Sequence, residues 1–228
     1  MNYTSIKKGT FINRPNRFIA NVLIDGITET VHVKNTGRCN EILIKGASVL
    51  LEESTNLNRK TRYSLVAAYK GSTLINIDSQ APNHVVYEAI LQNKIKAFKN
   101  VLTLKKEVTF GKSRFDLYFE KKSTKGFIEV KGVTLEKDGI AMFPDAPTLR
   151  GTKHILEMID AVNNNYKGYI LFLVQLKGVK CFTPNKEMDP EFDAALKKAK
   201  NKGVEILVYD SIIKENGLEI GEAVASTI

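Results

Sequence analysis

Two acidic residues and a lysine in the second half of the chain have the types and spacing needed to act on a phosphodiester. Asp116 lies in the run Arg114–Glu120, and Glu129 and Lys131 lie in the run Phe127–Gly132, with a polar turn between the runs. Both runs have the alternating pattern of β-strands, so the segment predicts a hairpin. If Asp116 faces Glu129 across that hairpin, two carboxylates and an ammonium group converge on one spot.

This arrangement predicts metal-dependent chemistry. Carboxylate oxygens suit Mg²⁺ or Mn²⁺, so Asp116 and Glu129 are candidate metal ligands and, with Lys131, candidate catalytic residues. A cation there could clamp a phosphodiester and generate hydroxide, while Lys131 positions the nucleophile or stabilises charge on phosphate. The competing interpretation is a solvated cross-strand charge pair, because Glu-x-Lys is common by chance and Glu120–Lys122 also matches. The apolar neighbours of Glu129 and an aspartate on the preceding strand favour the site.

Strict alternation also predicts which side chains of the first strand share a face. Phe115, Leu117 and Phe119 are expected on one face, and Asp116 and Tyr118 on the other.

The elements around this hairpin predict a mixed α/β domain over residues 81–228. Apolar stripes predict three helices, at about 82–95, 148–162 and 191–201. Besides the hairpin, strands are expected at 101–107, 169–176 and 204–209, and the residues after Tyr209 are expected to form only a short end-piece. This order is that of PD-(D/E)xK nucleases, in which a carboxylate on the first helix often joins the metal. Glu88 is in place for that role, although an exposed helix glutamate is the simpler explanation.

Residues 1–80 predict an all-β domain. Five β-rich runs are separated by turn residues, at 17–24, 28–33, 47–51, 63–69 and 73–77. Five strands in so short a segment favour an OB-like barrel, and an SH3-like barrel fits the count as well. The predicted fold class is therefore two domains: a five-stranded OB-like barrel in 1–80 and a nuclease-like α/β domain in 81–228.

The charge of the chain points to a polyanionic partner, and DNA is the predicted one. The 228 residues have a net charge of +9, and residues 1–80 hold 11 Lys and Arg against six acidic residues. Arg14, Arg17 and Phe18 suit phosphate contact and base stacking at the edge of the first strand, with a charged barrel rim as the alternative. Arg150 and His154 lie four apart on one predicted helix face, where they could meet phosphate or the hairpin site.

Composition excludes several other classes of protein. With 43% apolar residues the chain can form a core, and its most apolar run, Tyr169–Leu176, is far shorter than the roughly 20 residues of a membrane span. No apolar stretch follows the basic N-terminus, so we expect a cytoplasmic protein. Cys39 and Cys181 lack partners at metal-ligand spacing, which argues against a disulfide scaffold or a zinc site. The chain has no phosphate-binding loop, dinucleotide fingerprint or hydrolase elbow.

Four longer motifs resemble the sugar fermentation stimulation protein A family, at His32–Arg38, Gly132–Glu136, Phe143–Thr148 and Arg150–His154. Two positions depart from the family pattern: Lys34 stands where the family has Pro, and Cys39 where it has Met. Both touch a loop and leave the proposed metal site intact. The resemblance covers nearly the whole chain. It implies an OB-fold domain, a PD-(D/E)xK-like domain and a DNA-binding protein linked to regulation of sugar (maltose) metabolism. Arg38, in the first motif, joins the candidate DNA-binding residues.

Three classes of function stay open at this point. The first is a metal-dependent nuclease, and the second is a DNA-binding regulator whose carboxylates are only structural. The third is a carbohydrate-binding module, because OB barrels also bind oligosaccharides. The net charge argues against the third class, since neutral sugars need no positive field.

Overall fold

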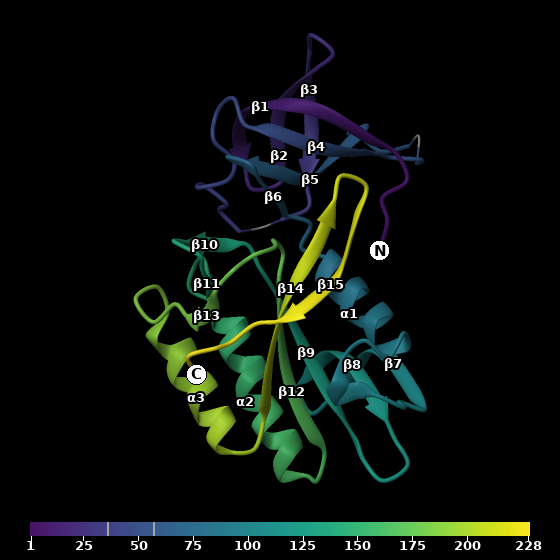
Figure 1. The fold of residues 1–228 in the computed structure, drawn as a ribbon, viewed down its shortest axis with the longest axis vertical. Coiled ribbons are helices and arrows are strands. Elements are labelled where there is room, and N and C mark those ends of the chain that lie inside the picture. The colour runs from purple at the N-terminus through teal and green to yellow at the C-terminus, as the bar shows by residue number, and fades with distance from the viewer. Residues whose placement is uncertain (36, 57) are drawn as a thin grey trace.

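The structure is a computed structural model that describes residues 1–35, 37–56 and 58–228. Thr36, which belongs to the His32–Arg38 motif, lies outside the described residues. The barrel and the α/β domain are stacked end to end along the long axis of the molecule (Figure 1). Cys39 and Cys181 are both free thiols in the structure.

The first half of the chain forms a closed barrel. Its ring consists of β1 (Ile6–Asn16), β2 (Ile19–Ile24), β3 (Ile27–Val33), β4 (Ser48–Glu53) and β5 (Tyr63–Lys70). Strands β1 to β3 form a meander, β1 also pairs with β4, β4 pairs with β5, and a short parallel pairing of β3 with β5 closes the ring. Apolar side chains from these strands fill the interior. The prediction of an OB barrel is confirmed.

The membership of the ring differs from the prediction. Strand β1 is not among the predicted runs, because two lysines, Gly9 and Pro15 hide its apolar alternation. Gly9 is needed there, since a Cβ would lie 2.6 Å from Cγ1 of Val22 on the neighbouring strand. The run predicted at 73–77 is β6 (Thr73–Asn76), a hairpin partner of β5 outside the ring.

The second half contains a six-stranded mixed sheet in the order β15-β14-β12-β9-β8-β7. Strands β7 (Thr103–Phe110), β8 (Ser113–Glu120) and β9 (Lys125–Val133) form an antiparallel meander. Strand β12 (Lys167–Val174), which contains most of the most apolar run of the chain, is central, and it is parallel to both β9 and β14 (Glu205–Lys214). A small separate sheet consists of β10 (Leu135–Lys137), β11 (Ile140–Phe143) and β13 (Cys181–Pro184).

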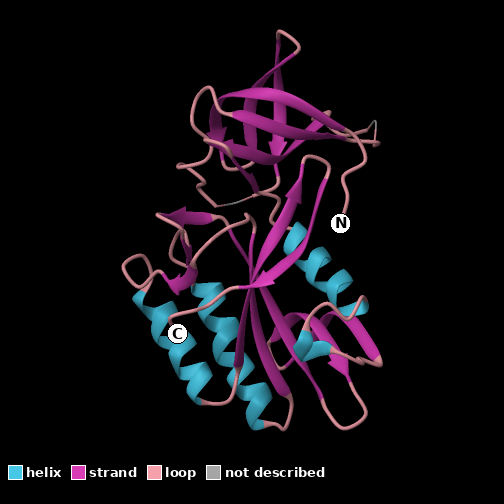
Figure 2. Ribbon diagram, in the orientation of Figure 1, coloured by secondary structure: helices cyan, strands magenta, loops and turns pink. Residues whose placement is uncertain are grey.

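Helices cover both faces of the large sheet (Figure 2). The helix α1 (Ala81–Leu91) packs on one face, and α2 (Leu149–Asn163) and α3 (Pro190–Asn201) lie together on the other. Thr148 caps α2, because its Oγ1 accepts the main-chain N–H of Gly151 at 3.1 Å. The first helix ends earlier than predicted, since Asn93 adopts a left-handed conformation and a short 3₁₀ turn, η1 (Lys96–Phe98), follows.

The end of the chain is not the short end-piece that the sequence analysis expected. Strand β14 continues to Lys214, and β15 (Gly217–Ala223) returns antiparallel along it. Asn216-Gly217, a typical hairpin turn sequence, lies between the two strands. This hairpin rises from the sheet to the barrel (Figure 1), where Glu215 forms an ion pair with Lys8 at 2.5 Å.

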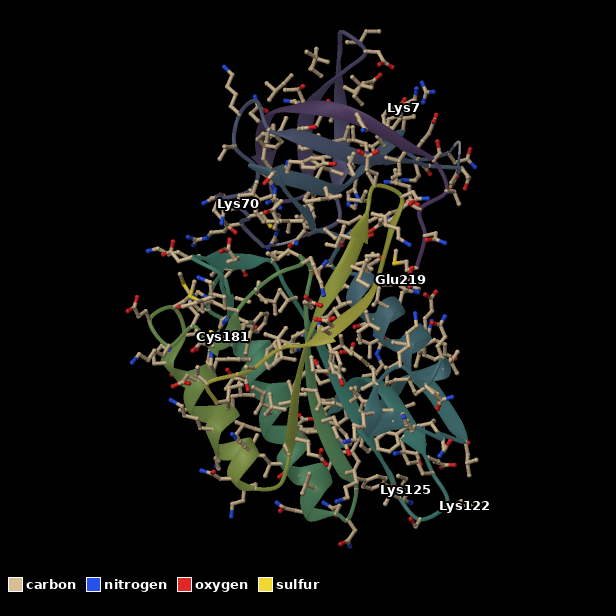
Figure 3. The ribbon with its side chains drawn as sticks, viewed as in Figure 1. Lys7, Lys70, Lys122, Lys125, Cys181 and Glu219 are labelled. Carbon is tan, nitrogen blue, oxygen red and sulfur yellow. The ribbon has the colours of Figure 1, made fainter. Side chains whose placement is uncertain are left out.

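Polar contacts also join the two domains. Asp78 is only 1% exposed and pairs with Lys34 of the barrel at 3.3 Å. Its main-chain oxygen accepts a hydrogen bond from Nε2 of Gln175 at 3.0 Å. Lys70, at the end of the barrel that faces the second domain (Figure 3), forms an ion pair with Glu136 at 2.7 Å. These contacts hold the barrel beside the segment that enters α1.

Candidate active site

The β8–β9 hairpin diverges at Asp116. The ladder between its strands ends at the pair Leu117–Ile128, and one further step in the same register would place Asp116 opposite Glu129. In place of a main-chain bond, Oδ2 of Asp116 accepts the N–H of Val130 at 2.8 Å. The predicted hairpin is therefore present, and its two carboxylates lie where the strands separate.

The alternation of β8 also breaks at Asp116. On β7, Glu107 has a φ of +59°, and its pairing with Asp116 is missing from the β7–β8 register. As a result, Phe115 packs in the core beneath α2, whereas Leu117 and Phe119 pack in the core beneath α1. The prediction of a common face for these three residues is wrong, because the irregular backbone turns the strand at the carboxylate.

Asp116 is a partly buried carboxyl group with protein donors at both oxygens. Asn83, in the first turn of α1, donates its Nδ2 hydrogen to Oδ1 at 2.8 Å, and Val130 donates to Oδ2. Burial, followed by repulsion from Glu129, raises the pKa of Asp116 to about 6, although these donors and Lys131 oppose the shift. A cation near both carboxylates would relieve this repulsion.

Glu129 is the centre of the cluster. Its side chain is 3% exposed, and its Oε1 lies 2.5 Å from Nζ of Lys131 and 2.5 Å from Nδ1 of His154. Burial alone would raise the pKa of Glu129, but the hydrogen bonds from His154 and Lys131 and their charge hold it below its usual value. The other oxygen, Oε2, is buried and has no hydrogen-bond partner among the described residues.

The unpartnered Oε2 of Glu129 shows whether these residues fit a metal ion. A buried carboxylate oxygen without a donor is costly and needs a partner. In the described part of the chain no group of three or more His, Cys, Asp and Glu side chains could hold a metal ion by itself. Magnesium commonly uses one or two carboxylates and takes its other ligands from water and substrate phosphates. The pair Asp116 and Glu129 fits that pattern.

Glu88, the third predicted metal ligand, is not part of the cluster. Its Oε2 lies 2.6 Å from the N-terminal amino group of Met1, in a different pocket, and its side chain is 48% exposed. Five residues along a helix correspond to a rotation of about 140° relative to Asn83, so the two side chains point to different sides of α1. The helix residue that contacts Asp116 is Asn83, which a pattern of carboxylates does not predict because its side chain is an amide.

The raised pKa of Asp116 predicts a pH effect on the metal-free protein. In the unfolded chain an aspartate ionises near pH 3.9, whereas Asp116 in the folded protein ionises near pH 6. The neutral carboxyl group therefore contributes its full stabilisation of the folded state below about pH 4, and this contribution is lost as the pH rises through about 6. In EDTA, the unfolding free energy of the wild type should fall by about 1 kcal/mol relative to Asp116→Asn between pH 5 and pH 7.5. Urea unfolding at the two pH values measures this difference. If the unfolding free energies of the two proteins change equally with pH, the prediction is wrong.

The guanidinium of Arg14, a predicted DNA contact, is already bound to main-chain oxygens of the protein, and its predicted role at DNA stays open. Its guanidinium donates four hydrogen bonds of 2.6–2.8 Å to main-chain oxygens, those of Arg17, Asn35, Gly37 and Arg38. The side chain thus holds the loop that carries the His32–Arg38 motif. A phosphate could bind Arg14 only by displacing these bonds.

Replacement of Arg14 should therefore affect stability. Arg14→Met removes four charge-assisted hydrogen bonds and should lower the unfolding free energy by about 2–4 kcal/mol. Arg17→Met is the matched control, because that guanidinium is exposed and lies over the Phe18 ring, 5.0 Å from its centroid; its effect should stay within about 0.5 kcal/mol. Urea unfolding of both variants measures the two losses. Equal losses of unfolding free energy would show that the hydrogen bonds of Arg14 do not stabilise the loop.

The other predicted DNA contacts divide into two groups. Arg17, Phe18, Arg38 and Arg150 are exposed, so their predicted role stays open. His154 is only 8% exposed and contacts Glu129, so it lies at the hairpin site, which is one of the two places that the sequence predicts for it. Arg150, four residues earlier on the same helix, is exposed.

A pocket of about 320 Å³ adjoins the cluster on the α1 side. Asp116 forms part of its wall, and its other polar lining residues are Ser79, Gln80, Asn83, His84, Lys106 and Glu107. Glu107 forms an ion pair with Arg114 at 2.7 Å, and the ammonium group of Lys106 lies over the Tyr87 ring, 4.2 Å from its centroid. The pocket therefore gives a polar ligand access to Asp116.

Two family models match the chain. The model described as SfsA N-terminal OB domain matches residues 12–77, and the model described as Sugar fermentation stimulation protein RE domain matches residues 80–217. In the described part of the chain, no helix has both the length and the apolar character needed to cross a membrane.

Similar proteins cover the whole chain. The sugar fermentation stimulation protein homolog of Alkaliphilus oremlandii is 56% identical over 229 residues, 98% of this chain and 97% of the relative. The homolog of Clostridium botulinum strain Langeland is 56% identical over 225 residues, with 98% of each chain covered. A solved structure, described as Pyrococcus furiosus SfsA in complex with Ca²⁺, has a TM-score of 0.92 and 28% identity and covers 100% of this chain and 98% of its own.

Proposed function

Because the chain belongs to the sugar fermentation stimulation protein family, we propose that it is a DNA-binding protein whose second domain holds a divalent-metal-dependent phosphodiesterase site. In this proposal the barrel contributes to the DNA-binding surface, and the divergence of β8 and β9 forms the site. The process that it serves would be regulation of sugar (maltose) metabolism, a part of the proposal that rests on the family alone.

The observation that carries the proposal is the buried, unpartnered Oε2 of Glu129 in a cluster with Asp116 and Lys131. A solvated charge pair on a strand would be exposed and would leave no polar atom without a partner. Here the carboxylate is buried, repels a second carboxylate and has one free oxygen. These features favour a site built for a cation.

We propose Mg²⁺ or Mn²⁺ as that cation, held by Asp116 and Glu129. The solved relative is described in complex with Ca²⁺, which also takes oxygen ligands. When bound, such an ion supplies Lewis acidity that stabilises negative charge on a phosphodiester and lowers the pKa of water.

The residues of the chain have separate roles. Asn83 and the Val130 N–H hold Asp116 in place through its two oxygens. Lys131 uses one of its three N–H donors on Glu129, so the others can meet a phosphate oxygen as charge develops in the transition state. Lys106, in the adjoining pocket, would turn from the Tyr87 ring, 4.2 Å from its ammonium group, to contact a neighbouring phosphate.

A second candidate is a DNA-binding regulator that does not cleave. One observation favours it: both oxygens of Asp116 and one oxygen of Glu129 already have protein donors. In this case the cluster would be a structural feature, and DNA binding would not depend on a divalent ion.

Supercoiled plasmid nicking separates the two candidates. The protein is incubated with plasmid and Mn²⁺ or Mg²⁺, beside an EDTA control, and DNA binding is measured in parallel by gel shift. We expect nicking that requires the cation. Binding without nicking would support the regulator, and nicking that survives EDTA would contradict the proposed site.

A further inference from the structure

We propose that His154 is a positioning residue that holds Glu129 in its metal-binding orientation while Lys131 turns to the substrate. The proposal rests on the proposed function and assigns a role that neither the family models nor the relatives' descriptions give to this residue. It starts from an asymmetry in the cluster: two donors meet one oxygen of Glu129, and none among the described residues meets the other.

The two donors are not equivalent. Lys131 has a long flexible side chain, 15% exposed, on the same strand as Glu129. The side chain of His154 comes from α2 and is 10% exposed, and the ring of Phe115 packs edge-on against it with 6.4 Å between the ring centroids. The imidazole is thus fixed by packing, whereas the ammonium group can move. If Lys131 breaks its hydrogen bond to Glu129 to contact the substrate, His154 is the donor that stays bound to Oε1.

Retention of that bond matters because a carboxylate can rotate. Without a fixed donor at Oε1, Glu129 could turn either oxygen toward the cation, or turn both away. With His154 in place, Oε1 stays in its hydrogen bond and Oε2 stays free for the ion. Removing a residue that hydrogen-bonds to a metal ligand typically lowers the metal affinity about 10–100-fold.

The role requires a proton on one particular nitrogen. Glu129 is an acceptor, so Nδ1 of His154 must carry the hydrogen, in the neutral or the charged ring. An asparagine side chain can place an N–H close to the Nδ1 position, whereas leucine fills a similar volume without a donor. His154→Asn and His154→Leu therefore separate hydrogen bonding from packing.

The experiment measures Mn²⁺ binding to the full-length protein without DNA, by electron paramagnetic resonance of the free ion. We expect His154→Leu to raise the dissociation constant about 10–100-fold, and His154→Asn to change it by about threefold or less. In a Lys131→Ala background the effect of His154→Leu should be larger than in the wild type, because no donor to Oε1 then remains. His32→Leu, in the barrel, is the matched control and should bind Mn²⁺ like the wild type.

A second readout does not depend on metal. Long-range ¹H–¹⁵N NMR of the metal-free protein should show His154 with hydrogen on Nδ1, with the three histidine signals assigned from single variants. A ring with hydrogen only on Nε2 would overturn the inference, even if His154→Leu fails to fold. Equal Mn²⁺ affinity of the wild type and His154→Leu would overturn the role of His154 and leave the proposed function in place. A wild type that binds no Mn²⁺ would overturn the proposed function as well.

Discussion

Asp116→Asn and Glu129→Gln should each lower the Mn²⁺-dependent nicking rate by about 10³-fold or more. Both substitutions keep the shape of the side chain and remove the negative charge that draws a cation to the site. The loss of Mn²⁺ affinity should therefore accompany the loss of rate. Single-turnover nicking and Mn²⁺ titration of the same preparations measure both quantities.

Lys131→Ala should behave differently from the two carboxylate variants. It leaves both carboxylates in place, so Mn²⁺ should still bind, while the rate falls by about 10²–10³-fold through loss of a donor to the developing charge. Glu88→Gln and Lys122→Ala are the matched controls, because Glu88 contacts Met1 and Lys122 lies in the distant turn of the hairpin (Figure 3). Nicking that persists in Asp116→Asn, or that falls equally in the controls, would refute the assignment.

The part of the site that could be predicted from sequence is the part that a single hairpin creates. Asp116, Glu129 and Lys131 lie within 16 positions, and strand alternation with a short turn relates them directly. Asn83 and His154 reach the same place from helices on opposite faces of the sheet. No local pattern encodes that meeting, because it depends on how each helix packs on the strands.

The missed strands have a related cause. Strand β1 is held in the barrel by its neighbours on both sides, so it needs little β-propensity of its own. Strand β15 lies at the sheet edge, and its alternation is interrupted by Gly221, beside Asp210. Arg14 shows the same limit for a side chain: its type indicated a surface cation, but the fold places four carbonyl groups around it.

The remaining large effect concerns DNA affinity and follows from the net charge of +9. If phosphate contacts dominate binding, counterion release should lower the affinity for duplex DNA about 10³-fold or more between 50 and 200 mM salt. Binding in EDTA, which excludes cleavage, can be followed by fluorescence anisotropy over this range. Affinity that does not change with salt would contradict electrostatic binding.

The slope of log affinity against log salt concentration also shows which residues contact phosphates. Arg17→Ala, Arg38→Ala and Arg150→Ala each remove an exposed guanidinium and should reduce the slope by about one unit each if that residue binds a phosphate. Arg62→Ala is the matched control, because it removes the same charge from an exposed arginine that is already paired with Glu53 at 2.7 Å. An equal reduction in the control would mean that DNA responds to the overall charge and not to these positions. A reduction confined to Arg38 and Arg150 would place the DNA at the junction of the two domains, since Asp145, in the loop that leads into α2, accepts the N–H of Arg38 at 3.2 Å.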